Sequence, residues 1–211
     1  TQRLTPIVNG ESKIRHYDLT VADASGLVVY TESADRALPK SFSWNGLANT
    51  GDAAGTRCAD GAYSASLATV AENGNEASAS TQAFIIDTVA PSIEVSVPYT
   101  LFSPEPTSSR QTIPVTAKSS AEDKWTGAVV DGSGKTLRHY TWQGVVPSFD
   151  WDGTDDTGNK VADGSYRLVF ASEDAAGNKA SAEIGQITVD SREVKAYVST
   201  ELDAFSPNGD G

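Results

Sequence analysis

Short runs of alternating polar and apolar residues recur along the chain, and each run ends in a cluster of Gly, Asp, Asn or Ser. In the segment SIEVSV, residues 92–97, every second side chain is apolar, as in a strand with one buried face. Further strand candidates are 112–117, 125–130, 135–142, 165–172 and 184–189, separated by turn sequences such as DGSG at 131–134. This pattern predicts an all-β fold built from antiparallel β-sandwiches.

Large aromatic side chains occur at regular places within these runs. Phe149 and Trp151 alternate with acidic residues, so both aromatic rings point to one face of their strand. Tyr166 and Phe170 share a face of the 165–172 strand in the same way. We expect these rings to form the core of a sandwich.

The pattern occurs twice. SFSWNG at 41–46 returns as SFDWDG at 148–153, and DGAY at 60–63 returns as DGSY at 163–166. A period of about one hundred residues is too long for a solenoid repeat and typical of whole domains in tandem. The sequence therefore predicts one module over 1–90, a second over 91–190, and the opening of a third over 191–211.

The two copies differ at their beginnings. Residues 3–7 are expected to match 111–115, and nothing in the first copy matches residues 92–110, which contain the opening strand of the second. Residues 194–199, followed by FSP at 205–207, resemble that missing opening. A sheet edge left open can accept a strand from another chain, so one copy's C-terminal segment is a candidate to complete another copy's first module. The alternative is that the chain is an excerpt of a longer array.

Charge and composition restrict the partners. The formal net charge of −12 disfavours nucleic acid and anionic membrane surfaces. No apolar run approaches the ~20 residues that span a bilayer, so no direct membrane insertion is expected in this segment. The absence of methionine indicates a processed or excised piece of a longer protein. Cys58 is the only cysteine, which excludes an intramolecular disulfide and favours a free thiol in an inserted loop.

The repeated motifs resemble a bacterial Ig-like family related to the C-terminal Ig-like domain of the flagellar hook-capping protein. The resemblance rests on WDGTDDTGNKVADGSYRLVFASEDAAGNK at 151–179, on IDTVAP at 86–91 and on FSPNGDG at 205–211. It implies tandem Ig-like or fibronectin-III-like sandwiches from a bacterial secreted or surface protein. Such modules serve as spacers, stalks and adhesive units, so the resemblance implies a fold more than an activity.

An acidic stretch is the first candidate site. Its oxygen ligands are the kind that Ca²⁺ requires: Asp150, Asp152, Asp155, Asp156, Asn159 and Asp163. The first copy keeps the turn with Ser43 and Asn45 at two of these places, which favours a role in turn formation. The tail NGDG, Asn208 to Gly211, resembles part of an EF-hand loop, and calcium binding there stays open. We assign no catalytic, cofactor-binding or metal-binding residue, and no enzyme activity is predicted.

Tyr140 and Trp142 are the candidate partner-binding residues. They alternate with Thr141, so both side chains point to one side of their strand. If that side faces solvent, the two rings form a surface for a glycan or a protein; if it faces inward, they pack over a sandwich edge.

The sequence thus predicts a non-catalytic structural or adhesive segment of a larger extracytoplasmic bacterial protein. Short linkers, TVAP at 88–91 and SRE at 191–193, favour a semi-rigid spacer or assembly unit. The expected partners are neighbouring modules, other protein subunits or surface glycans, and no cofactor is expected. The alternative is a ligand-binding module for glycan or calcium.

Overall fold

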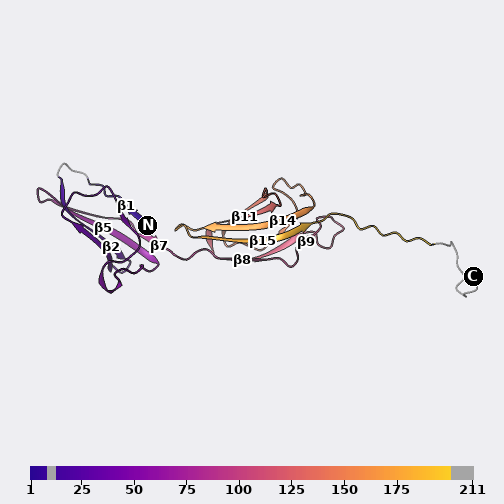
Figure 1. Cartoon of the computed structure of the whole chain (residues 1–211), viewed down its shortest axis with the longest axis horizontal. Helices are drawn as coiled ribbons and strands as arrows, with labels where there is room; N and C mark the ends of the chain where they lie inside the picture. The colour runs from indigo at the N-terminus through magenta and orange to yellow at the C-terminus, as the bar shows by residue number, and fades with distance from the viewer. Residues whose placement is uncertain (9–12, 201–211) are drawn as a thin grey trace, which may run out of the picture. The chain divides into compact units, whose positions relative to one another are not determined.

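The computed structural model describes residues 1–8 and 13–200, and it is built almost entirely of strands. The chain divides into two compact units (Figure 1). The first is Thr1–Ala90 with Glu173–Asn178, and the second is Pro91–Ser172 with the chain from Lys179 onward. The predicted all-β fold of tandem Ig-like sandwiches is confirmed. None of the described segments forms a helix with the length and apolar composition that a bilayer crossing requires.

The second module is a sandwich of a five-stranded and a three-stranded sheet. The larger sheet has the order β12-β11-β14-β15-β9, and the smaller has the order β13-β10-β8. The strands are β8 (Ile93–Ser96), β9 (Leu101–Phe102), β10 (Ile113–Ser119), β11 (Glu122–Asp131), β12 (Thr136–Gly144), β13 (Phe149–Trp151), β14 (Gly164–Glu173) and β15 (Lys179–Val189). β10 pairs antiparallel with β13 and β8, and β11 pairs antiparallel with β12 and β14, whereas β9 pairs parallel with the end of β15.

Alternation along these strands places the aromatic rings between the two sheets, as expected. Trp125 and Trp151 are fully buried, and Tyr166, Leu168 and Phe170 are buried from one face of β14. Phe102 of β9 packs edge-on against Trp151, with ring centroids 5.4 Å apart. The short β9 therefore seals one end of the core.

The first module repeats this frame with fewer strands. Its larger sheet has the order β3-β2-β5-β6, with β7 also paired to β5, and within the residues that the structure describes its smaller sheet consists of β1 and β4. The strands are β1 (Gln2–Leu4), β2 (Ile14–Asp23), β3 (Val28–Ala34), β4 (Phe42–Trp44), β5 (Gly61–Ala71), β6 (Glu76–Ser80) and β7 (Phe84–Ile86), with one 3₁₀ turn, Gly51–Ala53. Trp44 and Tyr17 are buried at its centre.

Two hydrogen bonds recur in both cores. The indole of Trp44 donates to the carbonyl of Leu47 (2.8 Å), and that of Trp151 donates to Thr154 (3.0 Å). The hydroxyl of Tyr63 donates to the carbonyl four residues upstream (2.8 Å), and that of Tyr166 does the same (2.6 Å). Bonds of this kind, from a tyrosine back to the preceding loop, are typical of Ig-like sandwiches.

The structure corrects the expected match at the start of the first module. Leu4 pairs with Phe42, whereas Val115 pairs with Phe149, so Leu4 occupies the place of Val115. The expected alignment of residues 3–7 with 111–115 is therefore wrong by three positions. The expected alignment puts Pro6 at the place of Pro114, whereas the buried side chain of Leu4 decides the register.

Residues 191–200 form no strand in the structure, so the expected strand at 194–199 is not formed here. A β-strand is stabilised by a hydrogen-bonded neighbour, and no described residue pairs with this segment. The FSP repeat at 205–207 and the NGDG tail at 208–211 lie outside the described residues.

Candidate functional site

Both modules hold their last residues in the same way. At the end of the first module, the backbone N–H and the hydroxyl of Thr88 donate to Asp60 Oδ2 at 3.0 and 3.1 Å. At the end of the second, the N–H of Ser191 donates to Asp163 Oδ1 at 2.9 Å. In each case the carboxylate directly before a core strand binds the second residue after the last strand of the module.

In each module a second carboxylate, on the first residue after the last strand, accepts a hydrogen bond from the backbone N–H two residues later. Asp87 Oδ1 accepts the N–H of Val89 at 2.9 Å, and Asp190 Oδ1 accepts the N–H of Arg192 at 3.1 Å. The guanidinium of Arg192 also binds the Asp190 carboxylate, with contacts of 2.8 and 2.7 Å, and lowers the pKa of Asp190 to about 2. We call these paired contacts the module exit: Asp60, Thr88, Asp87 and Val89, and in the second copy Asp163, Ser191, Asp190 and Arg192. The sequence had suggested only turns and linkers here; the signal was the equal spacing of the aspartates in both copies.

In the acidic stretch 150–163, the carboxylates accept hydrogen bonds from neighbouring turns and strands. Asp155 Oδ1 accepts the N–H and hydroxyl of Thr157 (2.9 and 2.7 Å) and the N–H of Asn159 (3.0 Å). Asp156 accepts the backbone N–H of His139 at 2.8 Å and contacts its ring at 2.6 Å. The Thr157 hydroxyl and the His139 side chain are the main causes that lower the pKa of Asp155 and Asp156, respectively.

Asp152 is bound from two elements. Its Oδ1 accepts the hydroxyl and N–H of Thr154 (2.6 and 3.1 Å) and the guanidinium of Arg138 on β12 (2.7 Å). Burial raises the pKa of Asp152, but the hydrogen bonds from Thr154 and the charge of Arg138 outweigh it, so the net shift is downward. Asp150 lies exposed on β13, and Asp163 belongs to the module exit.

The same turn chemistry occurs between β2 and β3 and between β11 and β12. Asp23 accepts the N–H and hydroxyl of Ser25 and the N–H of Leu27 at 2.9, 2.6 and 3.0 Å. Asp131 binds Ser133 and Lys135 with distances of 2.8, 2.6 and 3.0 Å. Within the ranges the structure describes, no three His, Cys, Asp or Glu residues gather as metal ligands. The aspartates of these turns are thus bound by backbone and hydroxyl donors.

Tyr140 and Trp142 lie on the inner face of β12. Their rings are stacked, with centroids 5.5 Å apart, and Trp142 also stacks on Phe170 at 6.1 Å. Phe149 contacts both rings, at 4.8 and 5.4 Å. Burial raises the pKa of Tyr140 to about 12. Both side chains are half-buried, so this geometry favours packing at the edge of the core, and a role in partner binding stays a prediction.

Gly127 makes room for this pair. A Cβ atom on Gly127 would lie 2.7 and 2.8 Å from two ring carbons of Trp142, closer than real contacts allow. In the first module, the strand register places Leu19 where the second has Gly127, and Ala34 where it has Trp142. The two modules therefore fill these two places in opposite ways: the first has the larger residue, Leu19, on the inner strand, and the second has the larger residue, Trp142, on the edge strand.

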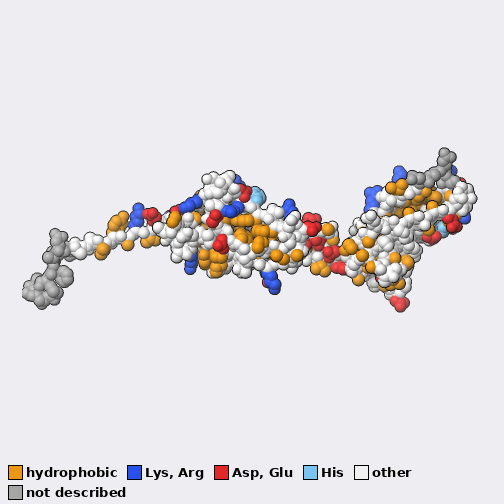
Figure 2. Space-filling model, turned by 180° about the vertical axis from the view of Figure 1, so that it is seen from behind, with side chains coloured by type: hydrophobic (Ala, Val, Ile, Leu, Met, Phe, Trp, Pro, Cys, Tyr) orange, Lys and Arg blue, Asp and Glu red, His pale blue; other side chains and the backbone are white. Residues whose placement is uncertain are grey.

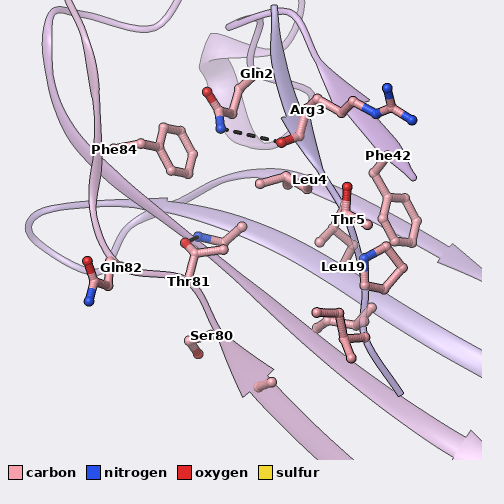
Figure 3. A pocket seen from close by; sticks show the side chains of 15 residues that line it. Gln2, Arg3, Leu4, Thr5, Leu19, Phe42, Ser80, Thr81, Gln82 and Phe84 are labelled. Carbon is pink, nitrogen blue, oxygen red and sulfur yellow. Dashed lines mark hydrogen bonds between the residues drawn. The ribbon is translucent and has the colours of Figure 1, made fainter. Parts of the chain in front are cut away.

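An apolar groove of about 390 Å³ opens on the first module (Figure 3). One wall consists of residues 2–7 and the other of residues 79–82 and Phe84, with Leu19, Phe42, Ala65 and Leu67 also lining the groove. Figure 3 shows Leu4 and Thr5 on the first wall, and Ser80, Thr81, Gln82 and Phe84 on the second. The missing counterpart of residues 92–110 was the sequence signal for an open edge, but the groove itself depends on how the strands pair.

Cys58 packs partly buried against the core of the first module. Burial, reinforced by the charge of Asp23, raises the pKa of the thiol. A raised pKa keeps the sulfur protonated and weakly nucleophilic near neutral pH. The geometry therefore favours a structural free thiol.

The family comparison agrees with this geometry. Residues 105–181, within the second module and its strands β10 to β15, match the model of the FlgD Ig-like domain family. This match covers the WDG and DGSY motifs, so the resemblance to the Ig-like domain of hook-capping proteins is confirmed for the second copy. No curated protein matches the chain.

Several solved structures are similar in part. The tetra-tandem repeat in the extending region of a large adhesion protein is 20% identical over 86% of this chain and 43% of that one, with a TM-score of 0.39. Dimeric latent PorU from Porphyromonas gingivalis is 16% identical over 65% of this chain and 13% of its own, with a TM-score of 0.38. The fibronectin(III)-like modules of Clostridium thermocellum CbhA are 11% identical over 92% and 88%, with a TM-score of 0.45. The chain thus spans less than half of each of the first two proteins.

Proposed function

We propose that this chain is a non-catalytic structural or adhesive segment of a larger bacterial protein outside the cytoplasm, with Ig-like modules that act as a semi-rigid spacer. The observation that carries this proposal is the module exit, which is built alike in both copies. Because Asp60 holds Thr88 and Asp87 holds Val89, little of the linker before Pro91 is left without a hydrogen bond to its own module. Proline restricts the next step further. A spacer needs this control of the direction in which the chain leaves each module.

The use of the polar residues supports the same function. The carboxylates of Asp152 and Asp155 accept hydrogen bonds from backbone N–H groups and hydroxyls of their own loop, and Asp156 accepts them from His139. These bonds stabilise the loop and leave the carboxylates poorly suited to proton transfer. Catalysis by paired carboxylates needs groups whose pKa values lie near the working pH, whereas the pKa values of Asp152, Asp155 and Asp156 are lowered.

Distance measurements between the modules test the spacer function. Spin labels are placed at two exposed sites, one per module, by Leu27→Cys and Val145→Cys in a Cys58→Ser background. We expect a narrow distance distribution by pulsed electron spin resonance, and a broader one after Asp60→Ala. Asp163→Ala is the matched control, because it loosens the exit beyond both labels and leaves the distribution unchanged. A broad distribution in the chain with intact exits contradicts the spacer function.

A ligand-binding module for glycan or calcium is the second candidate, and the stacked pair Tyr140 and Trp142 is the observation that favours it. A glycan array and calorimetry with Ca²⁺ test it directly. Saturable glycan binding that is lost in a folded Trp142→Ala variant supports this candidate and contradicts a purely structural role. Failure of both assays leaves the spacer proposal as the better account.

A further inference from the structure

A loop covers the first part of the free edge of β12 in the second module. β12 is the last strand of its sheet, so one side of its backbone has no neighbouring strand among the described residues. The N–H of Asp156 donates to the carbonyl of Leu137 at 3.0 Å, and Asp156 Oδ1 accepts the N–H of His139 at 2.8 Å. Asp156 therefore takes the place of a paired strand as far as His139.

The first module covers its edge strand β3 in the same way. Asn49 stands at the place of Asp156, five residues after the core tryptophan. Its N–H donates to the carbonyl of Val29 at 2.9 Å, and its Oδ1 accepts the N–H of Thr31 at 2.8 Å. Such cover protects an edge strand, whose free N–H and C=O groups otherwise pair with a strand of another chain.

The two modules differ in the part of the edge that these loops do not reach. By strand register, residues 32–36 of the first module stand where the second has 140–144. The first has ESADR there, with three charged residues, and the second has YTWQG, with none. Figure 2 shows hydrophobic side chains gathered over the middle of the second module. Because charged residues on an edge oppose pairing, the second module leaves a segment suited to it, and we call residues 140–144 the uncovered edge.

The free backbone groups of the uncovered edge belong to Thr141 and Gln143. The N–H of His139 points away from β11 toward Asp156, so by alternation those of Thr141 and Gln143 point to the same side. No described residue pairs with either of them on that side. The strand ends at Gly144, whose φ of 76° suits glycine and lets the chain leave the sheet.

We propose that the uncovered edges of two copies pair antiparallel around a two-fold axis at Trp142, which joins their five-stranded sheets into one. Thr141 of one copy then lies opposite Gln143 of the other, and each such pair exchanges both N–H···O bonds. The segment is complementary to itself, as a closed two-fold contact requires, and this favours a second copy as the partner. The inference goes beyond the spacer function, because it adds a contact between chains side by side.

The loop cover and the strand end fix where the axis lies. An axis at Thr141 would bring Gln143 against His139, whose N–H is already bound. An axis at Gln143 would leave Thr141 opposite Val145, which lies beyond the strand. With the axis at Trp142, both free residues find a partner, and each chain leaves the sheet before it meets the loop of the other.

The side chains fit this arrangement on both faces of the paired strands. Thr141 and Gln143 are exposed and uncharged on the outer face, so no like charges meet there. On the inner face, the half-buried side chains of the two Trp142 residues lie opposite one another at a non-hydrogen-bonded pair, where side chains approach most closely. Tyr140 lies opposite Gly144, which leaves room for the ring.

Sedimentation of the full chain tests the second copy as partner. A contact limited to one strand pair is small, so we expect a monomer–dimer equilibrium with a dissociation constant on the order of 100 μM. Two copies that each carry a net charge of −12 repel one another, so salt should tighten the dimer. A chain that stays monomeric at all concentrations and salt levels overturns the proposal, and so does a monomeric chain that captures a strand of another protein at this edge.

Proline substitutions test the edge. Thr141→Pro removes an N–H that the module itself does not use, so the chain should stay folded by circular dichroism and lose the dimer. Ser33→Pro is the matched control, because Ser33 stands at the corresponding place on β3, and it should keep the dimer. A dimer that persists in folded Thr141→Pro overturns the proposal.

Disulfides test the register, and they do so even if Thr141→Pro fails to fold. In a Cys58→Ser background, a chain with Thr141→Cys is mixed with a chain with Gln143→Cys in oxidised glutathione. Residues opposite one another at a hydrogen-bonded pair have Cα atoms about 5.5 Å apart, within reach of a disulfide, whereas diagonal neighbours are too distant. We expect the mixed disulfide to form about tenfold faster than either chain links to itself, and equal rates overturn the register.

Failure of this proposal is distinguishable from failure of the spacer function. The dimer is judged by mass and by disulfides between chains. The spacer function is judged by the distance between the two modules of one chain, measured with labelled chains diluted in unlabelled ones.

Discussion

Two equivalent positions carry a large and a small residue in opposite order in the two modules, and this difference leads to a quantitative prediction. In the second module, Trp142 lies over Gly127; the first module has Ala34 and Leu19 at these places. If the pair shares one space, a change at either position alone is costly, and the combined change Gly127→Leu with Trp142→Ala recovers part of the loss. The variant then carries the pair that the first module already uses.

The structure sets the magnitudes. The Cβ atom of Gly127→Ala already meets the ring of Trp142 at 2.7 Å, and that ring is held by stacking on Tyr140 and Phe170. Overpacking of this kind costs about 1–3 kcal/mol, and Gly127→Leu lies at or above the upper end. Trp142→Ala costs about 2 kcal/mol, less than the ~3–5 kcal/mol of a fully buried aromatic, because Trp142 is half-buried. We expect a coupling free energy of about 2 kcal/mol in favour of the double variant.

Urea unfolding followed by tryptophan fluorescence measures this cycle, with circular dichroism as the check on folding. Trp125 and Trp151 report on the second module in every variant, and Trp44 reports on the first as an internal reference. The reasoning is refuted if the costs of the two single changes add to within about 0.5 kcal/mol, since additivity means that the side chains do not share a space.

Three further predictions concern the repeated contacts. Tyr166→Phe removes the hydrogen bond to the preceding loop and lowers the free energy of unfolding of the second module by about 1 kcal/mol. Tyr63→Phe has a similar effect on the first module. Variants as stable as the parent chain would contradict this prediction. Ca²⁺ leaves the melting temperature unchanged, because Asp155 and its neighbours are bound by turn donors, and a rise that is lost in Asp155→Asn would show that a cation site was missed. The protonated His16 ring donates hydrogen bonds to the carboxylates of Asp35 and Asp18, and these bonds raise the pKa of His16. The contact therefore stabilises the first module at about pH 6 and is lost as the pH rises through the raised pKa; His16→Gln should remove that part of the pH dependence in urea titrations.

Alternation and turn residues were sufficient to predict the sandwich and most of its strands. The run at 92–97 became β8, and the aromatic residues at matched places became the two cores. Alternation fixes only which face a side chain points to, so it could not place β1 against β4 along the strand. The expected match of residues 3–7 with 111–115 is therefore off by three residues, and the pairing of Leu4 with Phe42 decides the register.

The candidate sites were harder to predict, because they depend on residues distant in the sequence. The acidic stretch was recognised as turn chemistry, but the bonds from Asp60 to Thr88 and from Asp163 to Ser191 join residues far apart in the chain. For Tyr140 and Trp142 the sequence could show a shared face without deciding between inside and outside. Only the packing of Trp142 on Phe170, and of both rings on Phe149, places that face toward the core.

Pulling single molecules by their two ends is the most direct test of a structural role. A segment that transmits force through folded modules is expected to give two separate unfolding events, each of which lengthens the chain by roughly 300 Å, the span of about 90–100 extended residues. The first module, with fewer strands in its smaller sheet, should unfold at the lower force. Gradual extension without discrete events would contradict the account, because neither module would then bear load.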